Sequence, residues 1–278
     1  MTLPEVVSRL KQAGYVASSE LAMMLHLQIN LGRPLLLEGP AGSGKTQVAY
    51  ALAQALGYPL VRLSCYEGMG SEQALYEWNY AKQLAAMQGR RDENVFTEEF
   101  MLDRPLLKVL RQPSAVLLID EVDRADEAFE ALLLEFLQDF QVSIPELGTV
   151  KAPRAPVTIL TSNRTRPLSD ALRRRCLYSV VPWPSLEREL AIVLMHLPEC
   201  DEAVRGAVVR GVQCLRQWGL VKSPGIGETL DWLDSQRVLG YPGWTLEFLQ
   251  QTLGCVLKEW ADIEVVQSRL EDLLAFRE

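Results

Sequence analysis

A run of small residues ending in Lys45 and Thr46 has the types and spacing needed for phosphate chemistry. The segment reads G-x-x-x-x-G-K-T, follows the apolar residues 35–37 and opens a helical pattern at Thr46. Small residues let backbone N–H groups surround a phosphate at the positive end of a helix. Lys45 is expected to reach the β- and γ-phosphates, and the Thr46 hydroxyl to bind Mg²⁺. The predicted nucleotide-binding residues are Gly39, Pro40, Ala41, Gly42, Ser43, Gly44, Lys45 and Thr46, together with Asp120.

An acidic pair stands at the end of a second apolar run, where residues 117–119 lead to Asp120 and Glu121. Such a pair is more often a solvated turn. At the end of a buried parallel strand, however, Asp120 is expected beside the phosphate loop, where it can hold Mg²⁺ through water. We therefore assign the metal to Thr46 and Asp120. Glu121 is suited to orient and deprotonate an attacking water, which favours hydrolysis over transfer of the phosphoryl group to another small molecule.

A polar strand end and an arginine run complete the set. Thr161-Ser162-Asn163 ends a third apolar run, and the Asn163 amide could help Glu121 hold the water, although asparagine after a strand is more often a turn residue. A run of three arginines such as Arg173–Arg175 is usually an exposed, solvated part of the surface. We predict instead that one of these arginines acts on the nucleotide of a neighbouring subunit. The predicted catalytic residues are Glu121, Asn163, Arg174 and Arg175.

Charge is unevenly distributed around these residues. Residues 120–135 carry seven acids against Arg124, and residues 151–175 carry seven basic residues against Asp170. Opposed charges on one chain favour head-to-tail contact between copies, which closes into a ring when the rotation permits. A nucleic-acid-binding patch is the competing interpretation of the basic segment.

Five short apolar runs and the helical patterns between them are the elements that must position this chemistry. They predict an α/β fold with a parallel sheet flanked by helices, because strands covered on both faces are apolar throughout. The predicted strands are Pro34–Leu37, Leu60–Leu63, Ala115–Ile119, Val157–Thr161 and Leu177–Val181. The predicted helices between them are Thr46–Leu56 and Asp126–Phe140.

The pattern changes at Pro182-Trp183-Pro184-Ser185. Residues 1–183 are predicted to form a nucleotide-binding α/β domain, and residues 184–278 a small all-helical lid domain. The helices expected there are 185–197, 202–218, 227–239, 245–259 and one more that runs to the end of the chain.

Composition narrows the class of protein. The 278 residues are 48% hydrophobic and 23% charged, which excludes a disordered or collagen-like chain. With a net charge of −8, the overall electrostatic field of the protein does not attract a nucleic acid. Five cysteines without a C-x-x-C pair are expected to be reduced core thiols. With no secretion signal and no apolar run long enough for a membrane helix, a cytoplasmic protein without a membrane span is expected.

The phosphate loop, the acidic strand end, Asn163 and the arginine run, followed by a helical domain, resemble an AAA+ ATPase with a P-loop. The segments Phe129–Thr149 and Leu75–Tyr80 resemble the MoxR family, and within it the CoxD-like branch, which is associated with maturation of carbon-monoxide dehydrogenase and related molybdenum hydroxylases. The resemblance implies ATP and Mg²⁺ as cofactors and a homo-hexameric ring. It also implies a protein with a von Willebrand factor A domain as partner and chaperone-like remodelling of a client metalloenzyme.

The resemblance carries three further implications. Residues 65–87 would include the family's helix-2 insertion and residues 141–152 a hairpin insertion, both facing the pore or the upper surface. The aromatic residues Tyr76, Trp78 and Tyr80 would serve either as core residues or as a partner contact. Ser223-Pro224-Gly225 departs from the family's Ser-Pro-Arg, so the arginine that would sense the γ-phosphate is missing; Lys222 or Arg237 could substitute.

Other functions remain open at this level. A nucleic-acid-linked AAA+ motor shares a similar arginine run but is disfavoured by the acidic total and the lack of a recognisable DNA-binding module. A scaffold gated by ATP with little turnover would need the same loop. A small-molecule kinase would leave Asn163 and the arginine run without a role, and a GTPase would be expected to carry an N-K-x-D motif, which is absent.

Overall fold

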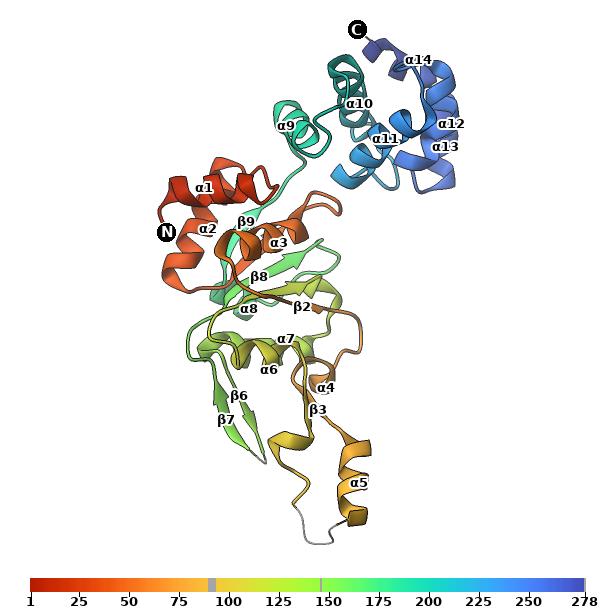
Figure 1. The fold of residues 1–278 in the computed structure, drawn as a ribbon. Coiled ribbons are helices and arrows are strands. Elements are labelled where there is room, and N and C mark those ends of the chain that lie inside the picture. The colour runs from red at the N-terminus through yellow and green to blue at the C-terminus, as the bar shows by residue number, and fades with distance from the viewer. Residues whose placement is uncertain (90–93, 146, 278) are drawn as a thin grey trace. The chain divides into compact units, whose positions relative to one another are not determined.

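The computed structural model describes residues 1–89, 94–145 and 147–277, which group by their contacts into two compact units (Figure 1). The first unit comprises residues 1–13, 17–39 and 45–181. The second comprises residues 14–16, 40–44 and 182–278. The loop between Gly39 and Lys45 therefore has its contacts mainly in the second unit, although the chain joins it to the first at both ends.

A five-stranded parallel sheet is the centre of the first unit, with the order β2-β5-β8-β1-β9. Its strands are β1 (Leu35–Glu38), β2 (Leu60–Ser64), β5 (Val116–Asp120), β8 (Val157–Ser162) and β9 (Leu177–Val180). Every strand lies within one residue of its predicted bounds, so the parallel α/β fold is confirmed. The three inner strands are almost wholly buried, which explains their mostly apolar sequences.

Helices cover both faces of this sheet (Figure 1). One face contacts α2 (Ser19–Leu31) and α3 (Lys45–Leu56), with α1 (Leu3–Gln12) packed on both helices. The other carries α6 (Pro105–Leu110), α7 (Glu127–Asp139) and α8 (Asp170–Arg175). Because strand side chains alternate, Leu117 and Ile119 pack into the α6–α7 core while Leu118 faces α3.

Parallel pairing brings the carboxyl ends of the strands to one edge of the sheet. Glu38 pairs in register with Ser162, and Ser64 with Asp120. The short 3₁₀ turn Val122–Arg124 follows β5 directly. The predicted polar strand ends thus share one edge.

Two antiparallel pairs interrupt the α/β pattern. The first is built from α4 (Ser71–Ala74), β3 (Tyr76–Trp78), α5 (Tyr80–Gly89), the 3₁₀ turn Glu98–Phe100 and β4 (Met101–Asp103). Since Tyr76 pairs with Asp103, this element runs beyond the expected end at residue 87. The second is the hairpin of β6 (Gln141–Ile144) and β7 (Gly148–Lys151).

The second unit is helical, as predicted for the C-terminal region. Its helices are α9 (Leu186–His196), α10 (Glu202–Leu215), α11 (Ile226–Leu239), α12 (Leu246–Val256), α13 (Trp260–Gln267), α14 (Leu270–Leu274) and the 3₁₀ turn Ala275–Arg277. Trp232, Trp244 and Phe248 are buried together in its core, and the Trp232 indole N–H donates to Thr252.

The expectation of one last helix is wrong. The chain breaks between α13 and α14 at Arg269, which leaves the helical region at φ −130° and ψ 25°. There the Arg269 guanidinium lies 3.8 Å from the centre of the Trp218 ring, and its Nε donates to Asp272. These contacts of Arg269 stabilise the break. In the described ranges, no helix is long and apolar enough to cross a bilayer.

Candidate functional site

Asp120 ends β5 with a buried carboxylate that is fully hydrogen-bonded. Its Oδ1 accepts from Thr46 Oγ1 at 2.9 Å and from Thr161 Oγ1 at 2.6 Å. Its Oδ2 accepts from Arg62 Nε at 3.1 Å and Nη2 at 2.5 Å. Because the Thr46 hydroxyl donates its proton to Asp120, its lone pairs stay available to a cation. The two residues predicted to hold Mg²⁺ are therefore in contact.

Arg62 is a site residue that the sequence analysis missed. It lies on β2, and its hydrogen bond to Asp120 raises the pKa of the guanidinium. The available signal was a charged residue in the middle of a predicted buried strand, at a position that alternation leaves exposed. The positive charge of Arg62 therefore lies beside the Asp120 carboxylate, which was predicted to hold a metal ion.

Glu121 stands in a left-handed backbone conformation, with φ 54° and ψ 47°. Its N–H donates to Thr161 Oγ1 at 2.9 Å, which stabilises this uncommon geometry. Its Oε1 accepts from Asn163 Nδ2 at 3.3 Å, and its Oε2 accepts from Arg124 Nη1 at 3.2 Å. The predicted catalytic pair Glu121 and Asn163 thus comes together, about half of the Glu121 side chain being open to solvent.

Asp123 fixes the turn that carries Asn163. Its buried Oδ2 accepts from the backbone N–H groups of Asn163 and Thr165 at 3.1 and 2.8 Å, and from Thr165 Oγ1 at 2.7 Å. Between them Arg164 adopts φ 61°. No sequence pattern singled out Asp123, because its partners are backbone groups 40 residues away.

Lys45 is buried at the start of α3. Its Nζ donates to Gly39 O at 2.8 Å. Burial lowers the pKa of the ammonium group, and the nearby carboxylates of Asp123 and Asp120 act in the opposite direction. The charge of Lys45 is thus held beside the acidic strand end.

The loop between Gly39 and Lys45 turns on glycines in the left-handed region: φ is 80° at Gly42 and 90° at Gly44. Ser43 N–H donates to Pro40 O at 3.4 Å, and Gly42 O accepts from Ile226 N–H at 3.0 Å. This curled backbone has the glycines that a phosphate-binding loop requires.

The three arginines of α8 have different surroundings. Arg173 pairs with the buried Glu38 at 3.1 Å, and Arg175 Nη2 donates to Gln138 Oε1 at 3.0 Å. Arg174 is exposed; its carbonyl accepts from Arg33, but within the described part of the chain its guanidinium has no hydrogen bond or ion pair. Among the described residues, Arg174 and Arg175 form no hydrogen bond or ion pair with Glu121 or Asn163 of their own chain.

Glu38 is a second residue that the sequence analysis missed. It accepts from Arg173, from Arg164 Nε at 3.2 Å and from the Tyr178 hydroxyl at 2.8 Å. Its position at the end of a buried strand, directly before Gly39, was the available signal. Glu38 links α8 to the start of the phosphate loop.

Part of the opposed charge seen in the sequence is neutralised within the chain. The buried Glu130 pairs with Arg166 at 2.5 Å and accepts from Ser169 N–H at 3.0 Å. Asp123 keeps its charge but is buried and accepts hydrogen bonds from Asn163 and Thr165, so it is not exposed to another copy. These two acids therefore hold residues 163–169 in place, and only the remaining charges are available for contact between copies.

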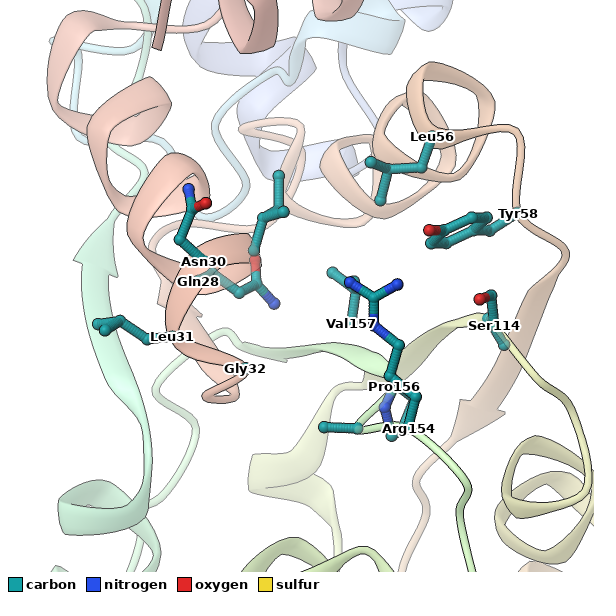
Figure 2. A pocket seen from close by; sticks show the side chains of 13 residues that line it. Gln28, Asn30, Leu31, Gly32, Leu56, Tyr58, Ser114, Arg154, Pro156 and Val157 are labelled. Atoms are coloured by element: carbon teal, nitrogen blue, oxygen red, sulfur yellow. The ribbon is translucent and has the colours of Figure 1, made fainter. Parts of the chain in front are cut away.

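A cavity of about 230 Å³ lies at the other edge of the sheet (Figure 2). Tyr58, Ser114 and Pro156 line it, and these residues precede the strands instead of following them. Gln28 also contributes, and its Nε2 donates to Thr158 O at 2.6 Å. The cavity contains none of the predicted site residues.

Comparison with known proteins agrees with this fold. The model of the AAA domain (dynein-related subfamily) matches residues 34–176, just over half of the chain. A mutant RuvB from Thermotoga maritima superposes with a TM-score of 0.51 at 20% identity, covering 84% of this chain and 67% of that one. The sheet and its helices therefore have the P-loop AAA fold.

Relatives found by sequence match only part of this chain. "Uncharacterized protein SH1500" of Staphylococcus haemolyticus is 31% identical over 154 residues, which are 52% of this chain and 54% of that protein. "Denitrification regulatory protein NirQ" of Pseudomonas aeruginosa is 24% identical over 193 residues, 67% of this chain and 68% of that protein. The match thus spans about half the length of SH1500.

Proposed function

Because this chain belongs to the AAA domain family (dynein-related subfamily), we propose that it is an AAA+ ATPase that hydrolyses ATP with Mg²⁺. The observation that supports this most strongly is the Thr161 hydroxyl, which bonds both the Asp120 carboxylate and the Glu121 N–H while Asn163 bonds the Glu121 carboxylate. In the proposed site Glu121 is the base and Asn163 the amide donor, beside the Asp120 carboxylate that would hold the metal ion.

The donor set fits Mg²⁺: Thr46 Oγ1 would bind the ion directly, and the Asp120 carboxylate, which accepts from Thr46, would hold it through water. When bound, Mg²⁺ supplies charge neutralisation to the phosphate oxygens. Lys45 adds its charge to the β- and γ-phosphates. Glu121 accepts the proton of the attacking water, and Asn163, 3.3 Å from Glu121, orients that water with it.

Replacing Glu121 by Gln tests the proposal. We expect phosphate release to fall by about 10²-fold or more while nucleotide binding persists, because the amide cannot accept the proton. The control is Glu127→Gln, which changes an exposed acid in the first turn of α7 and should leave the rate unchanged. Equal rates in wild type and Glu121→Gln would instead support a scaffold gated by ATP.

In this proposal the active form is a homo-hexameric ring that binds nucleotide between subunits. Arg174 is the residue best placed among the three arginines to reach a neighbour, because Arg173 and Arg175 have partners in their own chain. Arg175 remains the alternative, since a single hydrogen bond to Gln138 holds it. An arginine donated in this way stabilises the charge on the transferred phosphoryl group.

We propose further that the ring is of the MoxR type and remodels a client metalloenzyme with a von Willebrand factor A protein. The similarity to NirQ, whose name describes a regulator of denitrification, supports a regulatory role; remodelling of a metalloenzyme goes beyond that name. Glu121→Gln with ATP should trap the client in a pull-down from native cells. Recovery of a molybdenum hydroxylase or a von Willebrand factor A protein supports the assignment, whereas DNA with a nuclease indicates a nucleic-acid motor.

A further inference from the structure

The backbones of two glycines in the second unit, Gly42 and Gly225, are in close contact. Gly42 lies in the phosphate loop, and Gly225 precedes α11 in the position where an arginine was expected. A Cβ placed on Gly225 would lie 2.9 Å from Gly42 Cα, and a Cβ placed on Gly42 would lie 2.8 Å from Gly225 Cα. Real Cβ atoms essentially never approach so closely, so this contact requires glycine on both sides.

A hydrogen bond accompanies the contact and orients a peptide group. Ile226 N–H donates to Gly42 O at 3.0 Å. In a planar trans peptide the N–H points away from the C=O, so the Ser43 N–H is directed away from α11 and toward the inside of the loop, where Pro40 O accepts it at 3.4 Å. The position of Ile226 therefore determines where a predicted phosphate-binding N–H points.

A buried ion pair holds the turn before α11. Arg216 Nε donates to Pro224 O at 2.8 Å, and Arg216 pairs with the fully buried Glu189 at 2.6 Å. The guanidinium also lies 4.4 Å from the centre of the Trp183 ring. Thr229 Oγ1 donates to Glu189 at 2.9 Å. The first turn of α11 is thus fixed to α9 and α10.

Neither of the residues considered as a replacement for the missing arginine is needed in this arrangement. Arg237 lies near the other end of α11, about 17 Å along the helix axis from Ile226, and pairs with Asp234. Lys222 is exposed, and its N–H donates to Asp262.

We propose that Gly225 and Ile226 are positioning residues of the phosphate loop, so that the helical unit responds to nucleotide through a backbone contact instead of an arginine. This inference rests on the proposed ATPase function. An arginine sensor distinguishes ATP from ADP by contacting the γ-phosphate. A contact with Gly42 orients the loop itself, so its loss should weaken the binding of ATP and ADP alike.

The first test introduces the missing Cβ. We expect Gly225→Ala, made in the Glu121→Gln chain to prevent hydrolysis, to weaken binding of both ATP and ADP by about tenfold or more in calorimetric titration. Gly227→Ala is the matched control, because a Cβ there meets no atom within 4 Å. Its affinity for both nucleotides should equal that of the parent.

The second test removes the hydrogen-bond donor. Ile226 is the first residue of α11, where proline is tolerated, and Gly225 already has the extended backbone that precedes proline. Ile226→Pro and Ile226→Ala both lose the side chain, but only Ile226→Pro loses the N–H. Ile226→Pro should therefore bind both nucleotides about fivefold more weakly than Ile226→Ala.

The outcomes separate the two proposals. If the Glu121→Gln parent binds no nucleotide, the proposed function itself fails. If the parent binds but Gly225→Ala and Gly227→Ala bind equally, or if the loss is confined to ATP, the positioning role is overturned. Should Gly225→Ala melt well below the parent, the comparison of Ile226→Pro with Ile226→Ala decides by the same criteria.

Discussion

At the scale of single residues, the site depends on hydroxyl and guanidinium groups as much as on the acids. Thr161 Oγ1 donates to Asp120 and accepts from the Glu121 N–H, so one side chain fixes both. Arg62 holds the second oxygen of Asp120. The position of each acid is therefore set by neighbours from β2 and β8.

Thr161→Val is predicted to impair catalysis without unfolding the chain. Valine has a similar shape but cannot bond Asp120 or Glu121, so kcat for ATP hydrolysis should fall at least about tenfold. Thr158→Val is the control, because Thr158 is buried in the same strand and its hydroxyl donates to Pro156 O. Unchanged kcat in Thr161→Val would show that Asp120 and Glu121 are held by other groups.

The cysteines should differ in reactivity. Burial raises the pKa of the Cys65 and Cys176 thiols to about 12, and for Cys65 the nearby Asp120 adds to the effect. At pH 8 only about one in 10⁴ of these thiols is a thiolate, so iodoacetamide should modify them far more slowly than the half-buried Cys200, Cys214 and Cys255. Peptide mass spectrometry of the labelled native protein measures this order.

The same shift has a consequence for stability. Since the folded-state pKa lies above the unfolded value, the unfolded chain releases the two protons first as pH rises. These thiols should therefore favour the folded state below about pH 8.5 and lose that contribution as the pH rises toward 12. Equal labelling rates at all five cysteines would contradict both expectations.

The site residues that could be predicted from the sequence are those at the ends of predicted strands. Asp120 and Asn163 follow apolar runs, so parallel pairing alone was enough to place them at one edge. Arg62, Asp123 and Glu38 could not be found in this way, because their roles depend on which strand lies beside which and on backbone groups that no sequence pattern marks.

At the scale of elements, the buried pair of Arg216 and Glu189 joins α9 to the turn before α11. Both side chains are almost wholly buried, and Gln213 Nε2 donates to the same carboxylate at 2.6 Å. Removing one partner leaves the other charged and buried.

Arg216→Met should destabilise the helical unit by about 3–5 kcal/mol, because it leaves Glu189 without its cation. Arg237→Met, which breaks the exposed pair with Asp234, should cost less than about 1 kcal/mol. Urea unfolding followed by tryptophan fluorescence measures both, since every tryptophan except Trp78 belongs to the second unit. Similar midpoints for the two variants would show that the buried pair contributes little.

The bounds of an element were predicted best where a single apolar run of the sequence forms a single strand. The antiparallel pairing of Tyr76 with Asp103 between β2 and β5 was not predicted, because no sequence pattern marks which residues 27 positions apart will pair. The break at Arg269 was missed since it depends on a contact with Trp218, which lies 51 residues earlier in the sequence.

At the scale of the whole molecule, the proposal requires that one chain complete the site of another. Arg174→Ala should reduce phosphate release by about 10³-fold while preserving nucleotide affinity, whereas Arg173→Ala should also disturb Glu38 and the phosphate loop. Arg175→Ala tests the alternative donor.

Mixing two inactive variants distinguishes donation between chains from a role within one chain. Glu121→Gln retains Arg174, and Arg174→Ala retains Glu121, so a mixed ring contains some complete sites. Phosphate release should reappear in the mixture. A mixture as inactive as its components would place Arg174 outside the site of the neighbouring subunit.

The charge pattern along the sequence overstates the charge available for assembly, which stays a prediction, because Glu130 and Asp123 bind basic or polar partners in their own chain. Which surface charges remain is a property of the folded chain and could not be obtained by counting along the sequence.

If the chain forms the proposed ring, Glu38 would make communication between subunits directional. It is joined covalently to Gly39 and by an ion pair to Arg173, the residue before Arg174. In the proposed ring each subunit would present Arg174 to one neighbour only, so a change in its own phosphate loop would be transmitted to that neighbour and not to the other. Hydrolysis events would then follow one another around the ring in a fixed order, and a client would be pulled in one direction.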